Sequence, residues 1–405
     1  MEDNLPLVYF TPESGDIADI AHKVTLTLDS GLFIYAHLRQ PLATRDEMRR
    51  LIESIPQRLR SRLTLHDHFD LAEAYGLGGV HLNSRNTRVP KGWHGRVSRS
   101  CHSLDEAVSE IGSVAHYDYV TLSPVFPSIS KQGYSSGLAS LDIPVPGIVA
   151  LGGVTARRLP EVRRRGYSGA ALLGWLDVEL PEFNARLRQL RMFAGDGFAL
   201  QYITNGVSPG EVEQEVLAVL RGGCRWVQIR MKDAPDSVVE QAAMRVVPLC
   251  RAVGAVCLLD DRVHLAGRVL ASGVHLGKND MSPAEARKLL GENAIIGSTA
   301  NTLADIEAVT SLGASDYIGL GPYRFTLTKR RLSPVLGLEG YSEIMADEAA
   351  RRLPVVAIGG IECRDVPRLM AAGVDGVAVS GAIYLAANRK KATENFLKSL
   401  HKNIL

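Results

Sequence analysis

The sequence has few of the features that mark exported, membrane-spanning or disulfide-stapled proteins. Its five cysteines are an odd number and include no C-x-x-C pair, which argues against a disulfide framework or a structural zinc site. No stretch approaches the roughly 18 apolar residues of a membrane span, and the first residues lack a basic and then apolar signal segment. We therefore expect a cytoplasmic protein with no membrane partner.

Neither sign of charge dominates the chain. Lys and Arg total 46 against 44 for Asp and Glu, a net charge of +2, so nothing global indicates nucleic acid as a partner. Hydrophobic residues make up 46% and charged residues 22%, which is typical of a folded protein with substantial cores. At about 150 residues per domain, a chain of 405 residues is expected to form two or three domains.

The two halves of the chain run through the same short strings in the same order, about 200 residues apart. The matched segments are 7–12 with 200–205, 37–41 with 228–232, 63–72 with 257–266, 79–86 with 273–280, 123–131 with 321–329, and 149–154 with 356–361. Two glycines follow a helical pattern over 181–193 and precede a new apolar run. We predict one domain over 1–193, a linker over 194–197 and a second domain over 198–405.

Short apolar runs rich in Val and Ile alternate with segments of helical period in the second half, as in βαβ units. Strands are expected near 198–204, 225–230, 255–259, 273–276, 294–298, 316–320, 354–358 and 375–380. Eight parallel strands in about 205 residues favour a small barrel, in which ligands bind at the C-terminal strand ends. The predicted fold class is therefore α/β, with two tandem (β/α)8 TIM barrels.

Three polar side chains alternate at the end of the second of these strands. Gln228, Arg230 and Lys232 are two residues apart, so strand geometry places them on one face toward the barrel mouth. Placing two cations beside a buried apolar strand costs free energy unless an anion binds to them. This pattern predicts an anion-binding site.

Carboxylates follow the next two strands. Asp260 and Asp261 come after the third strand, and Asp280 follows the fourth. Oxygen ligands suit a hard cation, and Mg²⁺ takes one or two protein carboxylates together with water and substrate phosphate oxygens. The pattern predicts a Mg²⁺ site, although Asp280 equally suits the N-cap of the helix that begins near Pro283.

Glycines and hydroxyl groups follow the last three strands. The loop after the sixth strand contains Thr326, Thr328 and Lys329, and the last two strands end at Gly359–Gly360 and Ser380–Gly381. Barrels often hold phosphate at these last two loops, where glycines let backbone amides approach. These patterns together predict two anion-binding regions with a metal between them. They also predict a substrate, or a pair of substrates, that carries a phosphate and a diphosphate.

Residues 198–400 resemble thiamine-phosphate synthase. The resemblance is carried by Q-I-R-M-K at 228–232, L-L-D-D-R at 258–262, G-V-H-L-G-K-N-D at 273–280, I-I-G-S-T-A-N-T at 295–302, A-I-G-G-I at 357–361 and V-A-V-S-G-A-I at 377–383, with the loop from Thr326 to Lys329. That family joins 4-amino-5-hydroxymethyl-2-methylpyrimidine diphosphate to 4-methyl-5-(2-phosphoethyl)thiazole, giving thiamine phosphate and diphosphate. Small-molecule substrates are therefore the implied partners; whether the thiazole is carboxylated and whether the chain forms a homo-oligomer stay open.

The resemblance also assigns roles to residues. It implies that the diphosphate is held by Arg230, Lys232, Thr326, Thr328 and Lys329, among which Arg230, Lys232 and Lys329 would be catalytic. It places Gln228 and Thr299 against the pyrimidine, Mg²⁺ on Asp261 and Asp280, and the thiazole phosphate on Gly360, Ser380 and Gly381. The chain departs from the common family pattern at Asp260, where Asn is usual, and at Asn301, where His is usual. Asp260 is expected among the substrate-binding residues.

Residues 5–188 resemble a diverged member of the same superfamily, nearest to its thiazole tautomerase-like branch. Pro41 and Asn86 replace the counterparts of Lys232 and Asp280, which weakens the metal and diphosphate half of the site. A phosphate site is still predicted from Arg39, Ser128, Ser130, Lys131, Gly153 and Gly174.

The tautomerase interpretation meets a difficulty, because Pro124 occupies the position of that branch's catalytic histidine. His66, His68, His81 and the Cys101–His102 pair remain, and we expect structural or polar roles for them. Cys101 and His102 are not expected to act together as a nucleophile and base, because adjacent strand residues point to opposite faces. The favoured hypothesis makes this half a phosphate-binding or accessory module. The alternatives are a thiazole phosphate tautomerase and, for the whole chain, a sugar-phosphate isomerase or epimerase barrel.

Overall fold

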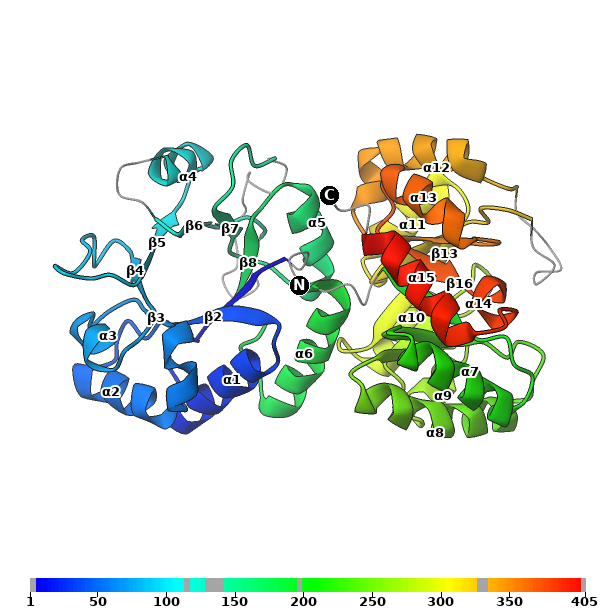
Figure 1. Ribbon diagram of the computed structural model, residues 1–405, viewed down its shortest axis with the longest axis horizontal. Coiled ribbons are helices and arrows are strands. Elements are labelled where there is room, and N and C mark those ends of the chain that lie inside the picture. Colours follow the sequence, from blue (N-terminus) through cyan, green and yellow to red (C-terminus); the bar gives the residue numbers. More distant parts are fainter. Residues whose placement is uncertain (1–4, 113–116, 128–141, 195–198, 326–333, 402–405) are drawn as a thin grey trace. The chain divides into compact units, whose positions relative to one another are not determined.

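The computed structural model describes residues 5–112, 117–127, 142–194, 199–325 and 334–401. The chain divides into two compact units, residues 1–190 and 191–405. Each unit contains a closed barrel of eight parallel strands with its helices outside them (Figure 1). The predicted pair of (β/α)8 barrels is confirmed. The predicted linker falls at the end of α6 and at residues outside the described ranges, so the exact domain boundary stays a prediction.

The first barrel closes where β1 pairs with both β2 and β8. Its strands are β1 (Leu7–Phe10), β2 (Phe33–Leu38), β3 (Leu63–Leu65), β4 (Gly79–Leu82), β5 (Arg96–Cys101), β6 (Tyr119–Leu122), β7 (Ile148–Ala150) and β8 (Gly169–Leu172). Its helices are α1 (Ile17–Asp29), α2 (Arg45–Ser54), α3 (Asp70–Ala74), α4 (Leu104–Ile111), α5 (Leu159–Arg164) and α6 (Leu180–Ala194).

The second barrel closes where β9 pairs with both β10 and β16. Its strands are β9 (Leu200–Ile203), β10 (Trp226–Ile229), β11 (Val256–Asp260), β12 (Gly273–Leu276), β13 (Ile295–Ala300), β14 (Tyr317–Leu320), β15 (Val355–Ile358) and β16 (Gly376–Val379), at the predicted places. Its helices are α7 (Pro209–Arg221), α8 (Asp236–Ala252), α9 (Val263–Ala266), α10 (Pro283–Leu290), α11 (Leu303–Leu312), α12 (Gly337–Ala346), α13 (Val366–Ala371), α14 (Gly381–Tyr384) and α15 (Arg389–His401).

Local sequence signals fix where the helices of the second barrel begin. Capping boxes start α7 at Ser208, α10 at Ser282 and α11 at Thr302, each with an acidic residue three positions later. Helices in a (β/α)8 barrel begin at the rim where the strands end. These caps therefore define the loops that carry the predicted site.

The wall of the second barrel is largely apolar, apart from buried polar side chains such as Gln201, Gln228 and His275. The strands of the second barrel are almost entirely buried, and their side chains pack with those of the surrounding helices in one continuous core. Strands of this kind have nearly continuous apolar sequences, because both faces of the sheet are covered. In the part of the chain that the structure describes, no helix combines the length and apolar character needed to cross a membrane.

A buried ion pair lies at the rim opposite the strand ends. Asp316, just before β14, accepts hydrogen bonds from Arg287 Nη2 of α10 at 2.8 Å and from the Ile296 amide at 2.6 Å. Both side chains of the pair are almost fully buried. Removing one partner of such a pair leaves an uncompensated charge in the interior.

We predict that Asp316→Ala lowers the free energy of unfolding of the second barrel by about 3–5 kcal/mol, because the Arg287 guanidinium loses its counter-charge. Chemical denaturation of the full chain measures the change. Glu213→Ala, which breaks the exposed pair with Arg245, is the matched control and should cost about 0–1 kcal/mol. Equal effects of the two substitutions would show that burial of the Asp316 pair is not decisive.

Candidate active site

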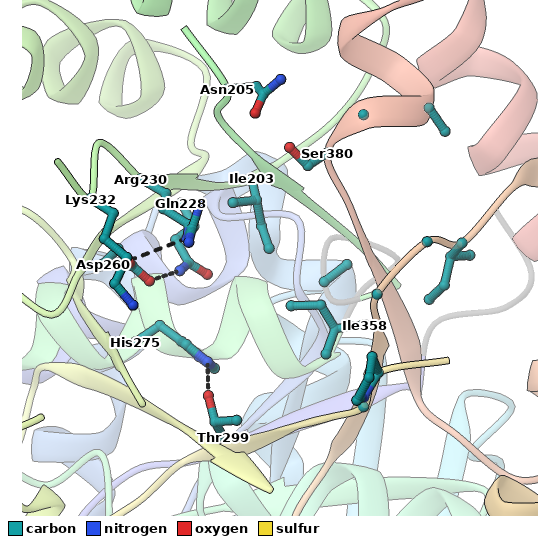
Figure 2. A pocket seen from close by; sticks show the side chains of 18 of the residues that line it. Ile203, Asn205, Gln228, Arg230, Lys232, Asp260, His275, Thr299, Ile358 and Ser380 are labelled. Atoms are coloured by element: carbon teal, nitrogen blue, oxygen red, sulfur yellow. Dashed lines mark hydrogen bonds and ion pairs between the residues drawn. The ribbon is translucent and has the colours of Figure 1, made fainter. Parts of the chain in front are cut away.

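A cavity of about 630 Å³ opens at the C-terminal strand ends of the second barrel (Figure 2). Among its lining residues are nine that the sequence predicted, namely Gln228, Arg230, Lys232, Asp260, Asp280, Thr299, Gly360, Ser380 and Gly381. They come from β10 and from the ends of β11, β12, β13, β15 and β16. The structure thus brings together residues that are far apart in the sequence, as expected for the rim of a barrel.

Charged and amide side chains meet on one side of this cavity. Gln228 Nε2 donates to Asp260 Oδ1 at 2.7 Å, and Arg230 Nε lies 3.5 Å from Asp260 Oδ2. Gln228 is itself oriented, because its Oε1 accepts from Gln201 Nε2 at 3.1 Å. Lys232 lines the same side (Figure 2). Two cations and a carboxylate are therefore preorganised on one wall.

The Asp260 side chain is only 20% exposed, and burial raises its pKa. Arg230 acts in the opposite direction, and the charge of Asp280 adds to the increase. The net pKa of Asp260 lies above the ordinary value, so its charge is poorly compensated by the protein alone. A cation in the cavity would favour the ionised form.

The other two predicted carboxylates are placed differently from each other. Asp280 lines the cavity, and its Oδ2 accepts from the Gly277 amide at 2.6 Å. Ser282 caps α10, so Asp280 is not the N-cap residue. Asp261 has a φ of 67°, and its carboxylate lies 3.0 Å from Arg262 Nη1 instead of lining the cavity. Of the three predicted carboxylates, those of Asp260 and Asp280 thus line the cavity, and Asp261 does not.

A hydrogen-bonded row supports the floor of the cavity. His275 Nε2 is paired with Thr299 Oγ1 at 3.1 Å, and His275 Nδ1 with the Tyr317 hydroxyl at 2.9 Å. Tyr317 also accepts from Gln201 Nε2 at 3.0 Å. We did not predict His275 from the sequence, although it stands at an inward-facing position of β12 in the repeated string G-V-H-L. Its position in a string that occurs in both halves is the signal that could have identified it as a site residue.

Glycines shape the opposite side. Gly359 and Gly360 have φ angles of 100° and 67°, and a Cβ at Gly359 would lie 2.7 Å from Pro322. Only glycine suits this turn, and it leaves backbone amides open to an anion. Ser380 faces the cavity across from the charged wall, with Ile203 between them (Figure 2). Thr326, Thr328 and Lys329 lie outside the described residues.

In the first barrel, the corresponding charges are already paired within the protein. Arg39 Nη1 lies 2.6 Å from Glu13 Oε1. Glu13 occupies the position that Gly206 has in the second barrel. Asp67 pairs with Arg85 at 3.0 Å and accepts from Asn86 Nδ2 at 2.7 Å. The charged groups of the predicted anion and metal sites are therefore neutralised internally.

Other residues predicted for the first barrel are placed as follows. Gly153 has a φ of 65°, and a Cβ there would lie 2.4 Å from the Pro127 carbonyl oxygen, so close packing requires glycine. Gly174 follows β8, and its carbonyl accepts from the Asp177 amide. Ser128, Ser130 and Lys131 lie outside the described residues.

The Cys101–His102 pair is not arranged for nucleophilic catalysis. Cys101 is buried whereas His102 is exposed, so the two side chains point to different surroundings. Burial raises the pKa of the Cys101 thiol to about 12, which leaves it protonated at neutral pH.

We predict that Asp260→Asn raises the melting temperature of the chain at pH 7 in the absence of divalent ions. The folded-state pKa of Asp260 lies above the unfolded value of about 3.9, so its ionisation disfavours the folded state at neutral pH and ceases to do so below about pH 4. The difference between the two proteins should therefore shrink as the pH falls toward 4. Differential scanning calorimetry at the two pH values measures it.

The matched control is Asp236→Asn. Its carboxyl is exposed, and the hydrogen bond from His264 lowers its pKa, so this substitution should not raise the melting temperature. A lower melting temperature for Asp260→Asn at pH 7 would mean that the contacts with Gln228 and Arg230 outweigh burial.

Comparisons with known proteins agree with this architecture. A family model described as "Thiamine monophosphate synthase" matches residues 7–175 and 200–383. The protein named thiamine-phosphate synthase from Bacteroides fragilis is 49% identical over 201 residues, which cover 49% of this chain and 98% of that protein. Its namesake from Bacteroides thetaiotaomicron is also 49% identical over 201 residues and is covered to 96%.

Among solved structures, a thiamine phosphate pyrophosphorylase from Pyrococcus furiosus is 34% identical, with a TM-score of 0.46. The match covers 51% of this chain and 98% of that one. Each of these relatives therefore corresponds to about half of the present chain, whereas the family model matches in both halves. The chain belongs to the thiamine monophosphate synthase family and contains two copies of its domain.

Proposed function

We propose that the second barrel joins 4-amino-5-hydroxymethyl-2-methylpyrimidine diphosphate to 4-methyl-5-(2-phosphoethyl)thiazole, or its carboxylated form, with release of diphosphate. The observation that carries the proposal is the two-sided cavity. Arg230, Lys232, Asp260 and Asp280 line one side, and the Gly359–Gly360 turn and Ser380 line the other. Two phosphorylated substrates can then bind with their uncharged rings between the two anion sites.

The charged wall suits the diphosphate. Arg230 and Lys232 would neutralise a leaving group that carries several negative charges, and Lys329, Thr326 and Thr328 are proposed to add contacts from the following loop. Preorganised cations of this kind stabilise charge that develops as the bond breaks, without reorganisation at that moment.

The carboxylate oxygens in the same wall fit a hard divalent cation. We propose Mg²⁺, with Asp280 and Asp261 as ligands. Asp280 and Asp260 line the cavity, whereas Asp261 would have to leave its ion pair with Arg262 to reach the ion. The raised pKa of Asp260 supports this fit, because a bound cation would compensate its buried charge. When bound, the ion supplies further charge neutralisation for the diphosphate.

The rings would lie between the two anion sites. Gln228 and Thr299 offer hydrogen-bonding groups to the aminopyrimidine, and His275 holds Thr299 in place. Ile203 and Ile358 provide apolar contact. Backbone amides at Gly360, Ser380 and Gly381 are proposed to bind the thiazole phosphate, as in other barrels with glycines after the last two strands.

Chemically, the step exchanges one bond for another at the pyrimidine methylene. The carbon–oxygen bond breaks, diphosphate leaves with the electron pair, and the aminopyrimidine supports a benzylic-type cation. The thiazole nitrogen then forms the new carbon–nitrogen bond. Orientation of the two rings and stabilisation of the departing charge are what the site must supply, so no protein nucleophile is needed.

We predict that Lys232→Ala or Asp280→Ala slows product formation a few hundredfold, corresponding to about 3–4 kcal/mol, while the variants stay folded. Lys232→Ala removes a cation from the diphosphate, and Asp280→Ala removes a ligand for the metal. The assay follows magnesium-dependent diphosphate release from the pyrimidine substrate, with circular dichroism to check folding.

Lys278→Ala is the control, because Lys278 lies near the same rim but pairs with Asp305 and does not line the cavity. It should retain normal turnover. Wild-type rates in Lys232→Ala or Asp280→Ala would contradict the assignment, and isomerisation of a sugar phosphate without diphosphate release would replace it with another function.

For the first barrel we propose a phosphate-binding or accessory module without coupling activity. The pairing of Arg39 with Glu13 and of Asp67 with Arg85 supports the absence of coupling activity, because a diphosphate–metal complex would have to compete with both intramolecular partners. The phosphate contacts proposed for this half come from Arg39, Gly153, Gly174 and the loop with Ser128, Ser130 and Lys131.

Calorimetric titration of the full chain with the thiazole phosphate tests the module. Two sites per chain are expected, one in each barrel, because the glycine turns are present in both. A single site would contradict phosphate binding by the first barrel. Isomerisation of the carboxylated thiazole precursor by a chain that carries Lys232→Ala would instead identify the first barrel as a tautomerase.

A further inference from the structure

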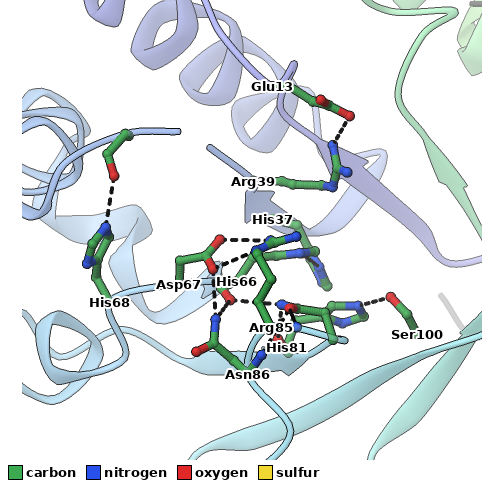
Figure 3. Close-up of polar contacts among 12 residues, drawn as sticks. Glu13, His37, Arg39, His66, Asp67, His68, His81, Arg85, Asn86 and Ser100 are labelled. Atoms are coloured by element: carbon green, nitrogen blue, oxygen red, sulfur yellow. Dashed lines mark hydrogen bonds and ion pairs between the residues drawn. The ribbon is translucent and has the colours of Figure 1, made fainter. Parts of the chain in front are cut away.

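We propose that the centre of the first barrel holds a divalent transition-metal ion of the zinc class, bound by His37, His66 and His81. Their ligand nitrogens can all lie within 4.8 Å of one another, and all three residues are buried. Figure 3 shows the three rings gathered beside Asp67, Arg85 and Asn86. His68, which the sequence also singled out, stands apart from this group.

The three positions are the counterparts of the second barrel's binding wall. His37 on β2 corresponds to Gln228, His66 after β3 to Asp260, and His81 on β4 to His275. All three counterparts line the cavity of the second barrel. The first barrel has therefore replaced an amide and a carboxylate with two imidazoles at ligand-facing positions.

This exchange changes which ion the site prefers. Oxygen donors suit Mg²⁺, whereas imidazole nitrogen suits Zn²⁺, Co²⁺, Ni²⁺ and Cu²⁺. The nearby carboxylate of Asp67 is paired with Arg85 and Asn86, which opposes a second hard-cation site here. The donor set thus selects the softer class of ion.

Two of the ring nitrogens are nearly as far apart as two nitrogen ligands of one zinc ion. His37 Nδ1 and His66 Nε2 are hydrogen-bonded at 2.9 Å, so one of these two nitrogens carries a proton and must lose it by a change of tautomer before both can bind an ion. Zinc–nitrogen bonds of about 2.0–2.1 Å in a tetrahedral site place two ligand nitrogens roughly 3.3–3.4 Å apart. If the two rings move apart by a few tenths of an ångström, an ion can bind between them.

The rings are in the protonation state that metal binding needs. Burial lowers the pKa of His37 and His66 well below 6.5 and that of His81 to about 3. Neutral imidazole is the form that ligates metal ions.

Hydroxyl groups around the cluster can fix the required tautomers. The Tyr119 hydroxyl is hydrogen-bonded to His37 Nε2, and Ser98 and Ser100 lie 2.8 Å from the two nitrogens of His81. A hydroxyl either donates or accepts, so His37 can carry its proton on Nε2 and donate it to Tyr119. Nδ1 of His37 can then bind the ion, whereas His81 would have to give up its contact with Ser98 or with Ser100 to offer a nitrogen. Ligating histidines usually have such outer partners.

The test is the metal content of the full chain, produced without a histidine tag in medium supplemented with Co²⁺. Loading during synthesis avoids the need for an ion to enter a buried site later. Excess Mg²⁺ is included during purification to compete with cobalt for the carboxylate cavity of the second barrel, where we propose a Mg²⁺ site. We expect one cobalt ion per chain, with an electronic spectrum characteristic of nitrogen ligands.

His37→Gln, which installs the residue type of Gln228, and His66→Gln should each reduce cobalt affinity by more than the roughly 10–100-fold that loss of an outer partner costs. His102→Gln changes an exposed histidine outside the cluster and should retain the ion. Wild-type protein without cobalt, or cobalt content unchanged by both cluster substitutions, would overturn the proposal. If the cluster variants fail to fold, the wild-type spectrum decides, because oxygen ligands alone would equally overturn it.

Discussion

Closure of eight parallel strands into a barrel is the constraint on which the rest of this structure depends. Because all the strands run in the same direction, their C-terminal ends lie at one rim, and the residues that follow them meet there. Gln228, Asp260, Asp280 and Ser380 are distant in sequence yet line one cavity for this reason. The apolar strands hold the frame, and the residues just beyond them are free to differ.

The duplication shows how far those residues can change on one frame. At the positions where the second barrel presents Gln228 and Asp260 to a cavity, the first barrel buries His37 and His66. Where the second barrel has Gly206, the first has Glu13, and this carboxylate pairs with Arg39. The family's fold is retained in both copies, whereas the charge pattern suited to diphosphate and a hard cation is found in the second.

Much of the fold could be predicted because it depends on local patterns. Alternation placed Gln228, Arg230 and Lys232 on one wall, and the apolar runs located all eight strands of the second barrel. The contrast between Asp260 and Asp261 could not be predicted, because it depends on a backbone turn with a φ of 67° at the strand end. The meeting of His37 with His66 depends on the lateral register of β2 and β3, which no local pattern encodes.

The most direct measurement of the central claim is a crystal structure of the full chain with magnesium and diphosphate. The account predicts diphosphate between Arg230 and Lys232 in the second barrel, with the ion against Asp280 and on the same side of the cavity. Diphosphate bound away from these side chains, or an ion that contacts none of the carboxylates at this rim, would contradict it.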